Sequence, residues 1–215
     1  MVVLQPSPRV LNEHMQKDLI FDFDGVIADT RDMLFNLFLD YHPTLSDEDF
    51  LAHFDGNVYE NPRVKFTPEN ADHLNDQYCQ RIDVSQVLAS IDPIKRLSAH
   101  HRLFIVSSGD ERAINQVLDA AGIGHRFAAI FGHNTHRSKV AKFEMIRNKF
   151  GASLNQALFV TDTLGDVREA KKVGLTTLAE TFGYHDRQRL SQGSPWDIVD
   201  TWPDVERAVE RCFSG

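Results

Sequence analysis

The sequence LIFDFDGVIADT, residues 19–30, ends an apolar run with two aspartates, Asp22 and Asp24, which are followed at once by Gly25. In an extended strand, residues i and i+2 point to the same side, so both carboxylates are expected to face one ligand. A nearly continuous apolar strand is typical of a parallel sheet that is covered on both faces. Glycine after the second acid lets the chain turn away sharply. The stretch therefore predicts a buried strand that carries two acids to the edge of a sheet.

Further apolar runs alternate along the chain with segments of helical period. Segments 111–121, 139–150 and 204–213 each place their apolar residues on one helical face. This alternation predicts an α/β fold with a doubly wound parallel sheet. The expected strands cover residues 19–23, 103–106, 128–131, 157–160, 175–178 and, more weakly, 198–199.

One long interval between the first two strands contains helical signals and no good strand. Ser46 can cap a helix that begins with the acids at 47–49, and Thr67-Pro68 is a second helix start. Asp92-Pro93 is a similar start for a helix through Leu97. We therefore expect an N-terminal extension (1–16), an α/β core (17–30 and 92–215) and a small helical insertion after the first strand (31–91).

Composition and charge narrow the class of protein. The 215 residues carry a net charge of −8, and no run rich in Lys and Arg occurs, so a nucleic-acid surface is not expected. No apolar run reaches the roughly 18 residues of a membrane span, and the N-terminus does not resemble a signal peptide. Two cysteines, Cys79 and Cys212, are too few for a disulfide framework. A cytoplasmic protein without nucleic-acid or membrane partners is the expectation.

Polar side chains follow the other strands at the same sheet edge. Ser107 and Ser108 follow the second strand, Lys139 opens the helix after the third, and Asp162 and Asp166 follow the fourth. Ligands of parallel α/β sheets bind beyond the carboxyl ends of the strands. Each residue alone has an ordinary explanation as a turn former, a helix cap or a surface charge. Clustered carboxylates, however, repel one another unless a cation lies among them, and oxygen ligands suit Mg²⁺. Hydroxyls and a lysine beside that cation predict a phosphate site.

This constellation resembles the haloacid dehalogenase superfamily, over nearly the whole chain beyond residue 16. The family's first and fourth motifs are specific acid patterns, whereas the second and third are a single hydroxyl and a single lysine. The family places a type 1 helical cap where this chain has its insertion, on a Rossmann-like core. The residues that match are Asp22 and Asp24, Ser107, Lys139, and Asp162 with Asp166.

Two positions depart from the pattern of many relatives. Thr161 stands where glycine precedes the first acid of the fourth motif, and Val140 stands where proline follows the lysine. Lys142 is a nearby alternative for that lysine. We prefer Lys139, because Ser138 can cap the helix and place it in the first turn.

The resemblance implies a phosphoryl-transfer mechanism. Asp22 would be the nucleophile that forms an aspartyl-phosphate, and Asp24 the acid and base that protonates the leaving alcohol and activates water. Family dehalogenases normally lack the second acid, so its presence favours phosphate chemistry. The implied phosphate ligands are Ser107, Ser108 and Lys139; the implied Mg²⁺ ligands are Asp22, Asp24 through its carbonyl, and Asp162; and Asp166 would orient Lys139 or a water on the metal.

The expected function is a Mg²⁺-dependent phosphomonoester hydrolase for a small phosphorylated metabolite, as a monomer or homodimer. A sugar-phosphate phosphomutase of the same superfamily is one alternative, and a non-catalytic phosphate-binding or regulatory protein is another. A dinucleotide-binding dehydrogenase is poorly supported, because Gly122 and Gly124 lack a third glycine at Phe127.

Other polar and aromatic residues are expected to be structural rather than catalytic. Surface positions are the more ordinary expectation for three histidines and three cations that could reach a substrate, and three aromatic residues are expected in the core of the insertion. These are His133, His136 and His185; Arg31, Arg63 and Lys65; and Phe50, Phe54 and Tyr59.

Overall fold

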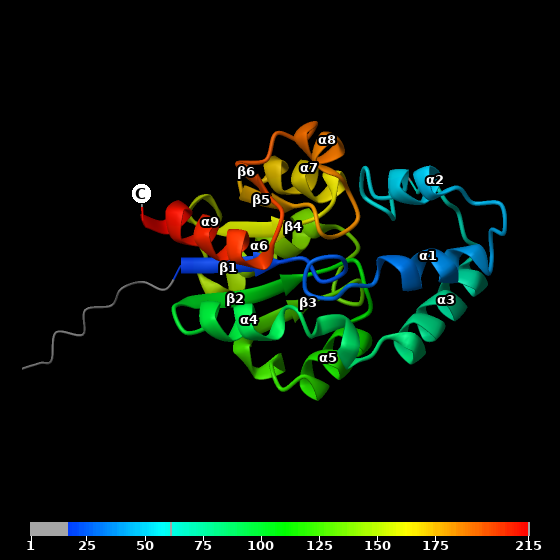
Figure 1. The fold of residues 1–215 in the computed structure, drawn as a ribbon, viewed down its shortest axis with the longest axis horizontal. Coiled ribbons are helices and arrows are strands. Elements are labelled where there is room, and N and C mark those ends of the chain that lie inside the picture. Colours follow the sequence, from blue (N-terminus) through cyan, green and yellow to red (C-terminus); the bar gives the residue numbers. More distant parts are fainter. Residues whose placement is uncertain (1–16, 61, 215) are drawn as a thin grey trace, which may run out of the picture.

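The computed structural model describes residues 17–60 and 62–214, and its centre is a six-stranded parallel sheet in the order β3-β2-β1-β4-β5-β6 (Figure 1). The predicted parallel α/β fold is confirmed. The expected extension at 1–16 lies outside the described residues. The strands are β1 (Lys17–Phe21), β2 (His101–Val106), β3 (Phe127–Phe131), β4 (Leu158–Thr161), β5 (Thr176–Glu180) and β6 (Asp197–Val199).

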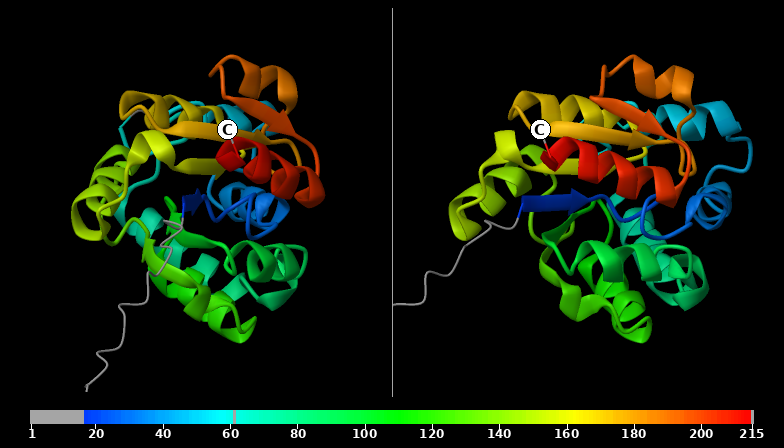
Figure 2. Two further views of the ribbon diagram at one scale, coloured as in Figure 1. Left: turned by 90° about the vertical axis from the view of Figure 1, so that its left-hand side faces the viewer. Right: turned by 60° about the vertical axis from the view of Figure 1, so that its left-hand side comes forward.

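Helices cover both faces of the sheet (Figure 2). Alternate residues of the central strands pack against the two helix layers. Leu19 and Phe21 belong to an apolar cluster with one helix layer, whereas Ile20 and Phe104 belong to a cluster with the other. Because both faces are covered, every position in the middle of these strands must be apolar. One layer contains α4 (Ile91–Leu97), α5 (Glu111–Ala120) and α9 (Trp202–Ser214); the other contains α6 (Lys139–Phe150) and α7 (Leu164–Lys172).

A helical insertion follows β1 and lies beyond the end of the sheet toward which the strands point (Figure 1). It contains α1 (Arg31–Leu39), α2 (Asp47–Ala52) and α3 (Pro68–Arg81), before a 3₁₀ turn at Val84–Val87. The hydroxyl of Ser46 accepts from the Asp49 N–H at 3.1 Å, and that of Thr67 accepts from the Asn70 N–H at 3.2 Å. Both predicted helix starts are therefore confirmed.

The first strand is shorter at its carboxyl end than the sequence pattern predicted. It ends at Phe21, so Asp22 and Asp24 lie in the following loop rather than in the strand. The Asp22 carboxylate accepts from the Phe23 N–H at 2.7 Å, and the Gly25 N–H donates to the Ala28 carbonyl at 2.8 Å. These local hydrogen bonds curl the chain away from the sheet. The expected same-side placement of the two acids by strand geometry is therefore wrong, although the loop still brings both to one cavity.

Two further details differ from the sequence prediction. Helix α4 begins at Ile91 with Ser90 before it, so Asp92 lies in the first turn and is not the cap. The short helix α8 (Arg187–Ser191) was not anticipated. Within the described ranges, no helix has the length and apolar character needed to cross a membrane.

Candidate active site

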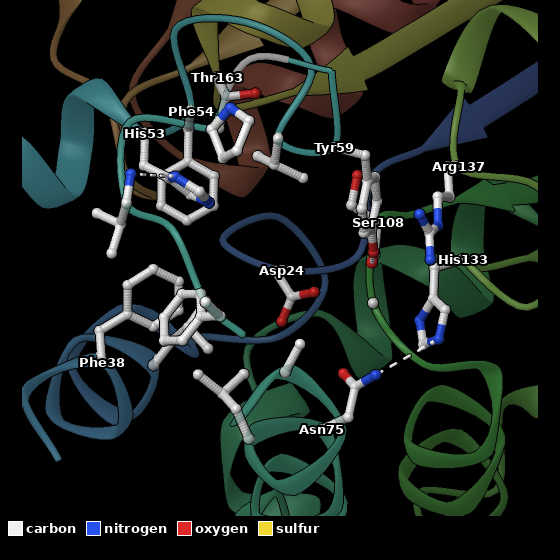
Figure 3. A pocket seen from close by; sticks show the side chains of 18 of the residues that line it. Asp24, Phe38, His53, Phe54, Tyr59, Asn75, Ser108, His133, Arg137 and Thr163 are labelled. Carbon is white, nitrogen blue, oxygen red and sulfur yellow. Dashed lines mark hydrogen bonds between the residues drawn. The ribbon is translucent and has the colours of Figure 1, made fainter. Parts of the chain in front are cut away.

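A cavity of about 610 Å³ lies between the carboxyl edge of the sheet and the insertion (Figure 3). Five of the predicted catalytic, phosphate-binding and metal-site residues line it: Asp22, Asp24, Ser108, Lys139 and Asp166. Two others, Ser107 and Asp162, are fully buried and do not line the cavity. The carboxyl edge of the sheet thus brings most of the predicted catalytic and binding residues to one cavity.

Lys139 joins two of the acids at the floor of the cavity. Its ammonium nitrogen lies 2.8 Å from an Asp22 oxygen and 2.6 Å from an Asp166 oxygen. Burial disfavours the charged lysine, but the two carboxylates outweigh this effect and raise its pKa. Burial also opposes the charge on Asp166, yet Lys139 and the hydrogen bonds around it lower the pKa of that carboxyl. The Thr161 hydroxyl is one of these donors, at 2.7 Å.

The negative charge of Asp22 is less well balanced by its surroundings than that of Asp166. Burial raises its pKa well above the usual value, Lys139 opposes this shift, and the nearby acids Asp166 and Asp162 add to it. A further positive charge at this point would favour the ionised carboxylate.

The second candidate lysine has a different place. Lys142 is fully buried, and its ammonium group donates to the backbone carbonyl of Ser107. Burial, reinforced by repulsion from Lys139, lowers its pKa to about 7. Lys142 does not line the cavity, so of these two lysines it is Lys139 that can reach a ligand there.

Asp24 is held by two hydroxyl groups, those of Thr30 and Tyr78. Thr30 donates to its Oδ1 at 2.8 Å, and Tyr78 of α3 donates to the same oxygen. Tyr184, after β5, lies 3.1 Å from the Thr30 hydroxyl. Burial raises the pKa of Asp24, although these hydrogen bonds oppose the shift. The acid is therefore both oriented and biased toward carrying a proton.

Sequence reasoning missed Tyr78 and Tyr184 as neighbours of the acid. For Tyr78 a signal existed, because Ala71, Leu74 and Tyr78 form an apolar stripe at helical spacing on a mostly polar segment. For Tyr184 no signal existed, since only the fold brings residues 184 and 30 together.

Asp162 lies directly behind Gly25. Its Oδ2 accepts from the Tyr184 N–H at 2.8 Å, while its Oδ1 is buried and has no hydrogen-bond partner among the described residues. Gly25 has φ +82°, and a Cβ there would lie 1.9 Å from Asp162 Oδ2, so only glycine is compatible with this approach. Burial raises the pKa of Asp162 to about 7.

These features fit a cation between Asp22 and Asp162. The partnerless Oδ1 of Asp162 and the raised pKa values of both acids are what a missing positive charge would correct. In the part of the chain that the structure describes, no three His, Cys, Asp or Glu side chains converge as a metal cluster. A cation here would therefore need backbone carbonyls and water as its other ligands, which is how Mg²⁺ is usually held.

The connection after α2 packs on the core at the rim of the cavity. The Gly165 N–H donates to the Phe54 carbonyl at 3.0 Å, and Asn57 donates to Glu169 at 3.0 Å. The hydroxyl of Tyr59 donates to the Ser108 carbonyl at 2.6 Å. Tyr59 therefore lines the cavity, and its expected place in the core of the insertion is wrong.

The remaining side chains divide into structural and cavity groups. Phe50 and Phe54 pack in the apolar cluster of the insertion, as predicted. Arg31 and Arg63 form ion pairs with Asp47 and Asp49, and His136 is exposed.

Lys65 is exposed, as expected, and also lines the cavity. Two other expected surface residues are placed differently. His133 is half-buried and lines the cavity. His185 is buried; its Nδ1 accepts from the Leu164 N–H at 3.0 Å and its Nε2 lies 2.9 Å from the Leu51 carbonyl. His185 therefore ties the insertion to the core.

Residues 19–180 match the family model for haloacid dehalogenase-like hydrolases, so the chain belongs to this enzyme family. Among curated relatives, it is 27% identical to a probable phosphoglycolate phosphatase of Pseudomonas savastanoi over 51% of this chain and 68% of that protein. It is 29% identical to a phosphoglycolate phosphatase of Synechococcus elongatus over 52% of each chain. Against a phosphoglycolate phosphatase of Pseudomonas syringae pv. syringae, the match covers only 40% of the relative.

Solved structures agree with the fold. A haloacid dehalogenase-like family protein from Streptococcus pneumoniae superposes with a TM-score of 0.75 at 19% identity, over 90% of this chain and 98% of that one. A predicted phosphoglycolate phosphatase from Haemophilus somnus gives 0.68 at 21% identity, over 90% and 98%. At these identities the likeness supports the fold alone.

Proposed function

We propose that this protein is a Mg²⁺-dependent phosphomonoester hydrolase that acts through an aspartyl-phosphate on Asp22. The observation that carries the proposal is the pair of acids at the cavity with different surroundings. Asp22 contacts Lys139, whereas Asp24 contacts hydroxyl groups and has a raised pKa. This difference in surroundings supports a nucleophilic role for Asp22 and a proton-carrying role for Asp24.

In the first step, a carboxylate oxygen of Asp22 attacks phosphorus and the bond to the leaving oxygen breaks. Asp24 gives its proton to that oxygen, so the alcohol leaves neutral. Lys139 neutralises charge on the phosphoryl oxygens. Asp24, now ionised, then takes a proton from water, which attacks the aspartyl-phosphate and releases inorganic phosphate and free Asp22.

The proposed Mg²⁺ ligands are Asp22, Asp162 and the backbone carbonyl of Asp24. When bound, the cation would supply charge neutralisation for the phosphate and for the ionised Asp22. Asp166 would keep Lys139 in place, since the two groups are 2.6 Å apart. Ser108 lines the cavity and is the proposed hydroxyl for the phosphate, whereas Ser107 is buried.

The insertion over residues 31–91 is proposed to act as a cap that shields the aspartyl-phosphate from water. Relatives named phosphoglycolate phosphatase support a small phosphate ester as substrate, with the phosphomutase and the non-catalytic protein as alternatives. A cytoplasmic location and a monomer or homodimer remain predictions.

A panel of phosphate monoesters tests the proposal. Inorganic phosphate should be released continuously from at least one ester with Mg²⁺, and chelator should abolish the release. A mutase would interconvert sugar phosphates and would need a bisphosphate primer. If the folded protein binds Mg²⁺ and phosphate but turns over no ester, the non-catalytic alternative is correct.

Replacing Tyr78 with Phe should lower kcat about tenfold or more, because a hydrogen bond to a charged or proton-carrying acid is worth roughly 1.5–3 kcal/mol. The ring remains, so packing of α3 and KM should change little. Steady-state phosphate release measures the effect. Tyr41→Phe is the control, since the Tyr41 hydroxyl contacts His73 and lies outside the cavity. An unchanged kcat in Tyr78→Phe would show that Asp24 needs no partner from the insertion.

A further inference from the structure

One wall of the cavity is formed by apolar side chains of the insertion. Leu34 and Phe38 come from α1, Val64 and Phe66 from the connection between α2 and α3, and Leu74 from α3. These side chains belong to one apolar cluster, whose surface is open toward the acids on this side. In Figure 3, Phe38 lies on one side of Asp24, and His133 and Arg137 lie on the other.

The apolar wall offers no cation to an acidic leaving group. Of the described cations that line the cavity, Lys139 is engaged by two carboxylates, and Arg137 lies over the Tyr59 ring at 5.5 Å. Lys65 is exposed. His53, beside the wall, accepts from the Val64 N–H through its Nδ1, and burial lowers its pKa to about 4, so it is neutral near pH 7.

The volume of the cavity also favours a large leaving group. Cavities of roughly 300–1,000 Å³ enclose ligands of drug size, and the 610 Å³ here falls within that range. A phosphate ester of a two-carbon acid would occupy only the end beside Asp22 and Asp24. It would leave the apolar side chains of Phe38 and Leu74 without a ligand group to pack against.

We propose that the substrate is a phosphate monoester with a bulky, mainly apolar leaving alcohol, whose aromatic or branched hydrocarbon group packs against Phe38, Phe66 and Leu74. The inference rests on the proposed phosphatase function and specifies its substrate class. Burial of hydrocarbon on this wall supplies the binding free energy. The polar side, with Asn75 and His133, remains available to a hydroxyl or amide on the same molecule; Asn75 Nδ2 and His133 Nε2 are 3.4 Å apart.

Esters with alcohols of similar acidity separate size from leaving-group chemistry. We would measure kcat/KM for 2-phenylethyl phosphate, ethyl phosphate and phosphoglycolate, with Mg²⁺, by phosphate release. The phenylethyl ester should exceed both others by at least about tenfold, which corresponds to burial of part of one ring. A value for phosphoglycolate equal to or above that of the phenylethyl ester overturns the inference and leaves the phosphatase proposal intact. Absence of release from every ester overturns both.

Leu74→Asn tests the wall itself. It should lower kcat/KM for 2-phenylethyl phosphate about fivefold more than for ethyl phosphate, because only the larger group reaches residue 74. Leu45→Asn is a matched control, since Leu45 is half-buried in the same cluster and does not line the cavity. Val64→Thr, an isosteric change at a residue of the wall, is a milder variant should Leu74→Asn unfold. Equal losses for both esters in the cavity variants would show that the wall does not contact the leaving group.

Discussion

The Asp22→Asn variant should lose phosphate release by at least about 10⁴-fold, because an amide cannot act as the nucleophile and removal of a nucleophile typically costs this much or more. Asn is nearly isosteric, so the loop after β1 should keep its shape. Reactions with a substrate labelled at phosphorus can be quenched with acid to trap the aspartyl-phosphate. The native protein should then carry the label on Asp22, and the variant should carry none.

Asp18→Asn is the control for the Asp22 experiment. Asp18 is also a buried acid, but it lies near the start of β1 and pairs with Arg102 at 2.6 Å, away from the cavity. The Asp18→Asn variant should differ from the native protein in stability only and should retain the label on Asp22. Label found on another residue, or turnover that survives in Asp22→Asn, would contradict the assigned nucleophile.

Asp24→Asn should lower turnover of alkyl phosphates by about 10²–10⁴-fold, the usual contribution of a general acid and base. For 4-nitrophenyl phosphate, whose alcohol leaves without a proton, the first step should remain fast and the second should be slow. Rapid mixing should therefore show a burst of nitrophenol equivalent to the enzyme, followed by slow release. Turnover of alkyl esters at the native rate would remove Asp24 from the mechanism.

The comparison of sequence with structure is clearest in the sheet and in the acid pair. Apolar runs such as 103–106 predicted strands correctly, because strands buried on both faces admit few polar residues. The boundary after Phe21 was predicted two residues too late, because Asp22 and Gly25 form local hydrogen bonds that the hydrophobic pattern does not contain. Such bonds depend on loop conformation rather than on composition.

The choice between Lys139 and Lys142 also separates what the sequence predicts from what the packing of the fold decides. The cap at Ser138 favoured Lys139 from the sequence, but both lysines lie on one helix and both are buried. Only the packing of α6 against β2 and α7 places one ammonium on Asp22 and the other on the Ser107 carbonyl.

By itself, the sequence determined the class of fold, the order of its elements, the helical insertion after the first strand and the edge at which the acids gather. These follow from hydrophobic period and from residue types at strand ends, which are local properties of the chain. Tertiary structure alone decided that Tyr78 contacts Asp24 and that Tyr184 contacts Thr30. It also decided that Tyr59 and His133 line the cavity and that one wall of the cavity is apolar. Each of these depends on segments far apart in the chain meeting, and no local pattern encodes such distances.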